Sequence, residues 1–183
     1  MDTEAFANSK VVHLIFRVIG AVMESRFRYR FAGPMKILRG ADIRPGQIVL
    51  EVGCGTGFYT VSAAQLIGDH GHLIAMDVLP VAIERVSKKV QASDLKNVRV
   101  VKGDAMDTGL AAECMDAVML FGVIPSPMVP LNRLLPEMHR VLKPKGKLAV
   151  WPPIPVWLPR SILRFGLFAY AGKRNGVYNF MRC

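Results

Sequence analysis

The chain has 183 residues, three cysteines and a formal net charge of +10. This length suits one domain with a single sizeable hydrophobic core. Three scattered cysteines exclude a disulfide framework, and their spacing matches no zinc site. We therefore expect a cytoplasmic protein without a metal. The basic charge is compatible with nucleic acid, an anionic membrane or an acidic substrate, and does not choose among them.

Residues 1–44 precede the predicted core, and we expect a helical extension there. The apolar run 11–23 is interrupted by His13, Arg17 and Gly20, which fall on one narrow helical stripe and leave a wide apolar face. The run is too short and too charged to span a bilayer, and its acidic flank is wrong for a signal peptide. Three roles stay open: a lid over a site, which we favour, a peripheral membrane contact, and a homodimer contact.

A glycine-rich loop follows the first predicted strand, at 47–52. Residues 51–57 read Glu-Val-Gly-Cys-Gly-Thr-Gly. Glycine permits positive φ and lets a ligand lie against bare backbone. A helix is predicted at 57–67, and the free N–H groups at its start favour a carboxylate or a phosphate. The loop therefore predicts a nucleotide-like ligand. We interpret Cys54 simply as a small residue that fits a tight turn.

An acidic residue ends the next predicted strand, at 72–76. Asp77 lies roughly 20 residues after the glycines, where a carboxylate can accept hydrogen bonds from two ribose hydroxyls. The alternative is that Asp77 caps the helix predicted at 80–92. The two roles are compatible, and we favour the ribose role.

Strands and helices alternate along the rest of the chain. This alternation predicts an α/β fold with a parallel sheet covered by helices on both faces. Asn175-Gly176 separates two strand-like runs and predicts a hairpin turn. In chain order, the remaining predicted elements are a strand at 98–102, a short helix near 107–112, a strand at 116–121, a helix at 130–142, a strand at 146–151 after the Lys143–Gly146 turn, and strand-like runs at 166–171 and 177–181.

Four landmarks in the right order carry a family resemblance. They are the glycine loop, Asp77, the Gly-Asp-Ala sequence at 103–105, and the strand at 116–121 with Asp116 at its start. A helix and the sequence Arg-Val-Leu-Lys-Pro-Lys-Gly at 140–146 follow that strand and also fit the family. The loop departs from the dinucleotide fingerprint because its third glycine comes one residue early. Over residues 45–152 the chain resembles the class I S-adenosylmethionine (SAM) dependent methyltransferases, most of all the methyltransferase type 11 group that includes the ubiquinone and menaquinone biosynthesis enzymes.

The resemblance implies a SAM-binding core at 45–183. It also implies a Rossmann-like, doubly wound, mostly parallel seven-stranded sheet with a C-terminal antiparallel hairpin. The glycine loop would hold the methionine part of SAM, Asp77 the ribose, and residues 104–105 the adenine edge. The residues that the resemblance assigns to the cofactor are Glu51, Gly53, Gly55, Gly57, Tyr59, Asp77, Val78, Asp104, Ala105 and Phe121.

No residue is predicted as a catalytic base. His70 and His72 fall at the far end of the predicted sheet, and His139 lies within a predicted helix. His13 would reach the site only if the N-terminal extension folds over it. An acceptor that loses its proton easily needs little help from the protein, whose main contributions are alignment and exclusion of water.

The acceptor is expected to be a small, apolar or lipid-like molecule. The segment 151–159 contains four prolines and two tryptophans, so it is either a stiff apolar wall of the acceptor pocket or a loop that merely packs over the sheet. RNA or protein methylation through the basic ends is one alternative, although the Asn/Asp-Pro-Pro-aromatic motif of base-amino methyltransferases is absent after the strand at 116–121. A SAM-binding protein without turnover is another.

Overall fold

The structure is a computed structural model that describes residues 33–126, 128–152 and 159–183. The helix predicted at 11–23 and residues 153–158 of the Trp/Pro segment lie outside these ranges, so the roles assigned to them stay predictions. Within the described ranges, no helix is long and apolar enough to cross a membrane.

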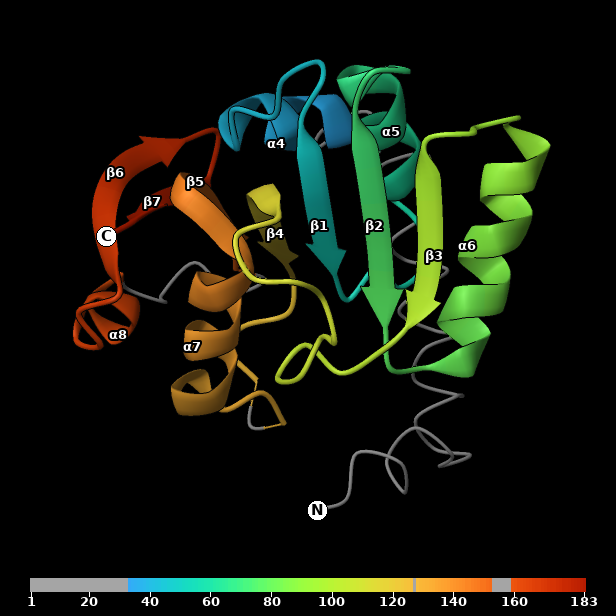
Figure 1. Cartoon of the computed structure of the whole chain (residues 1–183). Coiled ribbons are helices and arrows are strands. Elements are labelled where there is room, and N and C mark those ends of the chain that lie inside the picture. The colour runs from blue at the N-terminus through green and yellow to red at the C-terminus, as the bar shows by residue number, and fades with distance from the viewer. Residues whose placement is uncertain (1–32, 127, 153–158) are drawn as a thin grey trace.

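Seven strands form one sheet (Figure 1). The strands are β1 (Ile48–Val52), β2 (His72–Asp77), β3 (Val98–Lys102), β4 (Met115–Phe121), β5 (Leu142–Trp151), β6 (Phe168–Arg174) and β7 (Val177–Arg182). The helices are α4 (Pro34–Gly40), α5 (Thr60–Ile67), α6 (Pro80–Ala92), α7 (Leu131–Val141) and α8 (Arg160–Leu163).

The strand order is β3-β2-β1-β4-β5-β7-β6. Strands β1 to β5 are parallel, and β7 lies antiparallel to both β5 and β6. This order confirms the predicted doubly wound sheet with a C-terminal antiparallel hairpin. The Asn-Gly turn is also confirmed, because Asn175 (φ 50°) and Gly176 (φ 82°) both adopt the positive φ that such a tight hairpin requires.

Alternation along the buried strands divides the hydrophobic core into two layers. In β1, Leu50 and Val52 contact the layer beneath α7 and α8, whereas Val49 contacts the layer beneath α4 and α5. Figure 1 shows α7 and α8 on the near side of the sheet and α4 and α5 on the far side. Helix α6 covers the α5 side at β2 and β3 through Val86 and Val90. Both faces of β1 are therefore buried, as its nearly continuous apolar run predicts.

Two predicted element starts were wrong by three residues or more, and one predicted helix is absent. Helix α5 begins at Thr60 instead of 57, because the Gly57 N–H bonds the Cys54 carbonyl in a turn that delays the helix. Strand β5 begins at Leu142 instead of 146, with residues 143–146 bulging out: Met115 and Ala117 of β4 pair with Leu142 and Lys147.

The third error concerns the helix predicted near 107–112, where the structure has a loop between β3 and β4. Gly109 adopts φ 66°, which interrupts any helix there. The short helix α8 was not predicted, and α4 was expected only as part of a helical extension at 1–44. Leu38 of α4 and Ile162 of α8 are fully buried, so tertiary packing stabilises both helices despite their length.

Candidate functional site

A cavity of about 540 Å³ lies where β1, β2, β3 and β4 end. This edge, marked in Figure 1 by the arrowheads of β1, β2 and β3, is where open α/β sheets bind their ligands. Five of the ten predicted cofactor residues line the cavity, namely Gly53, Asp77, Val78, Asp104 and Ala105. The other five, Glu51, Gly55, Gly57, Tyr59 and Phe121, do not line it.

The glycine loop forms one wall because a side chain would not fit there. Gly53 adopts φ 67°, and a Cβ added to it would lie 2.9 Å from Val123 Cγ2. Both residues line the cavity. A flat ligand can therefore lie against the Gly53 backbone only because this position has no side chain.

Asp77 lies between the glycine loop and the start of α6. Its Oδ2 accepts a hydrogen bond from the Gly55 N–H and its Oδ1 accepts one from the Leu79 N–H, both at 2.9 Å. Burial raises the pKa of Asp77, and these backbone donors oppose that rise. An ionised carboxylate has about four acceptor sites, so it can still accept two further bonds. The N-cap residue of α6 is Leu79, so Asp77 is not the cap.

Glu51 points from β1 toward α5, on the side of the sheet opposite to Leu50 and Val52. Its side chain is buried, and its Oε2 accepts a 2.7 Å hydrogen bond from the Thr60 hydroxyl. Burial raises the pKa of Glu51 to about 8; the Thr60 bond opposes the rise, whereas the charge of Asp77 adds to it. Near neutral pH, Glu51 is therefore largely protonated.

Tyr59 and Phe121 pack in the core beneath α4 and α5. Their rings meet edge to face with centroids 5.0 Å apart, and the Trp151 ring lies 6.5 Å from Tyr59. Only about 5% of Tyr59 is exposed. The predicted contact of Tyr59 with a ligand carboxylate stays a prediction.

The segment after β3 forms another part of the cavity wall. Asp104 Oδ1 accepts a hydrogen bond from the Met106 N–H at 2.9 Å, and the Asp104 carbonyl accepts one from the Asp107 N–H at 3.1 Å. These bonds make a compact turn that presents Asp104 and Ala105 to the cavity. Each Asp104 oxygen keeps acceptor capacity for an amino group.

Sequence reasoning missed the wall that follows β4. Val123, Met128, Val129 and Pro130 line the cavity together with Arg133 of α7. The order of strands was the signal that could have found them, because β4 lies next to β1 and must end at the same edge of the sheet. None of the described histidines lines the cavity, so the structure offers no imidazole base there.

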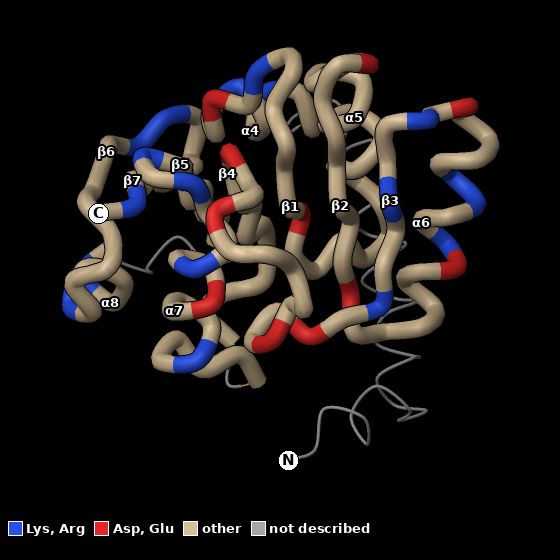
Figure 2. The backbone as a smooth tube through the Cα atoms, viewed as in Figure 1, with Lys and Arg blue, Asp and Glu red and all other residues tan. Residues whose placement is uncertain are grey.

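The charge on the C-terminal third is partly neutralised by ion pairs. Figure 2 shows Lys and Arg on β5, β6, β7 and α8, and no Asp or Glu follows Glu137 in the sequence. Three of these cations pair with acids elsewhere in the fold: Lys143 with Asp116, Lys147 with Asp42, and Arg182 with Glu113. The composition therefore overstates the free positive charge of this region.

Comparison with known families settles the affiliation. The model of the methyltransferase domain matches residues 49–146, which is more than half of the chain and includes the whole glycine loop at 51–57. The chain belongs to the class I SAM-dependent methyltransferase family. The donor site of this methyltransferase domain fits SAM, because Gly53 leaves room for the ligand and Asp77 retains acceptor capacity for a sugar.

Relatives of the domain include demethylmenaquinone methyltransferases. The one from Listeria welshimeri is 35% identical over 130 residues, which is 67% of this chain and 52% of the relative. The one from Bacillus cereus is 32% identical over 145 residues, or 75% of this chain and 60% of the relative. The chain thus spans little more than half the length of these relatives.

Solved structures agree with the fold. A SAM dependent methyltransferase from Aquifex aeolicus superposes with a TM-score of 0.76 at 24% identity, over 90% of this chain and 96% of that one. The PH0226 protein from Pyrococcus horikoshii superposes with a TM-score of 0.69 at 18% identity, over 92% and 96%. At these identities the likeness concerns the fold alone.

Proposed function

We propose that the protein transfers a methyl group from SAM to a small, apolar acceptor of the quinone type. The observation that carries the proposal is the resemblance to demethylmenaquinone methyltransferases at 32–35% identity. The apolar wall formed by Val123, Met128 and Val129 supports it, because such a wall favours an acceptor with an apolar ring or tail.

The described residues would act mainly by binding and alignment. When bound, SAM supplies a methyl group activated by its positively charged sulfur. Asp77 would accept hydrogen bonds from the ribose, and the Gly53 backbone would let the methionine part lie close to the sheet. None of the described histidines lines the cavity, and we assign no described side chain as the base, so the acceptor's proton would leave to water. An acceptor that ionises near neutral pH suits such a site.

A labelled-methyl assay tests the proposal. The protein would be incubated with SAM labelled in its methyl group and, in separate reactions, with a reduced demethylated quinone, total RNA and a protein extract. We expect label in the organic-soluble product of the quinone reaction alone. Label in RNA or protein would overturn the acceptor class. Binding of S-adenosylhomocysteine without any transfer would instead indicate a SAM-binding protein without turnover.

The matched controls are Asp77→Asn and Asp69→Asn. Asp77 lines the cavity, whereas Asp69 is exposed in the turn before β2, at the opposite edge of the sheet. At limiting SAM, transfer should fall strongly in the first variant and persist unchanged in the second. The peripheral membrane contact, the homodimer and the cytoplasmic location also remain proposals. Adding anionic vesicles to the quinone reaction tests the first of these.

A further inference from the structure

The loop between β3 and β4 forms part of the cavity wall and contains no helix of its own. Residues 103–106 line the cavity, and the chain then continues without regular structure to Cys114. Within the described ranges, the hydrogen bonds that residues 104–112 make outside their own loop come from Thr108 and Leu110. Both residues bond to side chains of α7.

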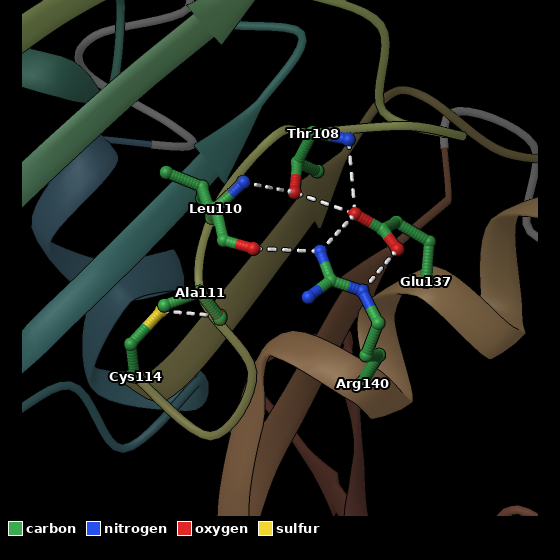
Figure 3. Close-up of polar contacts among 6 residues, drawn as sticks. All are labelled: Thr108, Leu110, Ala111, Cys114, Glu137 and Arg140. Atoms are coloured by element: carbon green, nitrogen blue, oxygen red, sulfur yellow. Dashed lines mark hydrogen bonds and ion pairs between the residues drawn. The ribbon is translucent and has the colours of Figure 1, made fainter.

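Glu137 is the main acceptor for this loop (Figure 3). Its Oε1 accepts hydrogen bonds from the Thr108 N–H at 2.9 Å and from the Thr108 hydroxyl at 2.6 Å. Arg140 binds the same carboxylate through Nε and Nη2, each at 2.7 Å, and Nη2 also donates to the Leu110 carbonyl at 2.8 Å. One carboxylate and one guanidinium thus hold both ends of the Thr108–Leu110 segment.

The Glu137 carboxylate is stabilised in its ionised form by these contacts. The Arg140 guanidinium, together with the bonds from Thr108, lowers the pKa of Glu137 to about 2 in spite of partial burial. Its side chain is only 11% exposed. Charge-assisted bonds to a largely buried carboxylate are stronger than neutral ones, so this junction is well suited to hold a loop.

The same helix supplies the neighbouring cavity wall. Pro130 precedes α7 and Arg133 lies one turn before Glu137, and both residues line the cavity. Arg133 and Glu137 are four residues apart and therefore share a face of the helix. Glu137 thus joins two cavity walls, the loop that carries Asp104 and Met106 and the helix that carries Arg133.

We propose that Glu137 is a positioning residue for the donor: through Thr108 it holds residues 104–106 where Asp104 can receive the adenine amino group. The inference depends on the SAM-binding part of the proposed function and not on the acceptor. Glu137 itself does not line the cavity. Substitution of Glu137 is therefore expected to change the preference of the site for the adenine base, because the residues that Glu137 holds are those predicted to face adenine.

The test compares two nucleosides by calorimetry. S-adenosylhomocysteine carries the adenine amino group, and S-inosylhomocysteine carries an oxygen at the same position. The variants are Thr108→Val, which removes the hydroxyl donor and leaves the Glu137–Arg140 pair, Thr108→Ser, which keeps the hydroxyl, and Glu137→Gln. The control is Glu84→Gln, which breaks an exposed pair with Lys88 on α6.

We expect wild type to prefer S-adenosylhomocysteine. Thr108→Val and Glu137→Gln should raise the Kd for S-adenosylhomocysteine about tenfold, as for the loss of a hydrogen bond to a charged group. They should also reduce the preference for S-adenosylhomocysteine over S-inosylhomocysteine. Thr108→Ser and Glu84→Gln should match wild type. Amide hydrogen exchange at residues 104–110 should be faster in the first two variants.

Other outcomes separate the two proposals. Equal affinity of wild type for both nucleosides, or an unchanged preference in Thr108→Val and Glu137→Gln, would overturn the role of Glu137. Lower stability with the preference intact would show a purely structural role and would overturn it too. Failure of wild type to bind either nucleoside would remove the donor site and with it both proposals. Binding without transfer to any acceptor would overturn the proposed function alone.

Discussion

Asp77 and Gly55 are 22 positions apart and share a 2.9 Å hydrogen bond from the Gly55 N–H to Asp77 Oδ2. The carboxylate predicted to hold the ribose therefore also holds the glycine loop. Since the other oxygen bonds the Leu79 N–H, one side chain fixes the loop after β1 relative to the start of α6. Ligand binding and loop geometry are therefore coupled at Asp77.

Asp77→Asn should weaken binding of S-adenosylhomocysteine roughly 10- to 100-fold. The substitution removes the charge from the bonds to the ribose, and a bond to a charged group is worth about 1.5–3 kcal/mol. Calorimetry measures the change. Asp69→Asn, the same substitution at an exposed site on the opposite edge, should leave the affinity unaltered. An Asp77 variant that binds as tightly as wild type would contradict the predicted ribose role.

Gly53→Ala should abolish tight donor binding, and Gly46→Ala should not. Both glycines have positive φ, 67° and 79°, so alanine costs about 1–2 kcal/mol of backbone strain at either position. At Gly53 the new Cβ also meets Val123 Cγ2 at 2.9 Å, whereas nothing lies within 4 Å at Gly46. Urea unfolding would compare the stabilities and calorimetry the affinities. Equal loss of affinity in both variants would rule out the steric explanation.

Glu51 should make the protein less stable as the pH rises. The folded protein holds the Glu51 proton until about pH 8, whereas the unfolded chain releases it near pH 4.5. The free energy of unfolding should therefore fall between about pH 4.5 and 8 through this group. Glu51→Gln keeps an acceptor for Thr60 and should lose this component of the slope. Urea unfolding at several pH values tests it, and parallel profiles for the two proteins would refute it.

Glu137 should act in the opposite direction at acid pH. Its pKa is about 2 in the folded protein against an ordinary value of 4.5. Its contribution to stability is therefore complete above about pH 4.5 and is lost as the pH falls toward 2. Thermal unfolding from pH 2 to 6 should show wild type losing its advantage over Glu137→Gln across this window. A constant difference in stability would contradict the assigned pKa.

Local sequence patterns were sufficient to predict the strands of the sheet, and they placed Gly53 and Asp77 at the edge where the cavity lies. Short apolar runs that alternate with helical segments predict the parallel strands, and Asn175-Gly176 predicts the hairpin. Both signals are local, because each depends only on residues that are neighbours in the sequence. The glycine loop and Asp77 likewise mark where β1 and β2 end. Parallel strands end at one edge of a sheet, so the residues after them meet without further information.

Contacts between distant segments required the folded chain. Thr108 and Glu137 are 29 positions apart, and no periodicity in the sequence links them. No sequence pattern links Val123 to Gly53 either, although the two lie close together in the structure. Nor does one predict that the Tyr59 ring packs against Phe121 in the core. Local propensity favoured a helix near 107–112, yet the bonds to Glu137 and Arg140 stabilise a loop there. Propensity differences amount to less than about 1 kcal/mol per residue, so a few buried, charge-assisted bonds can outweigh them.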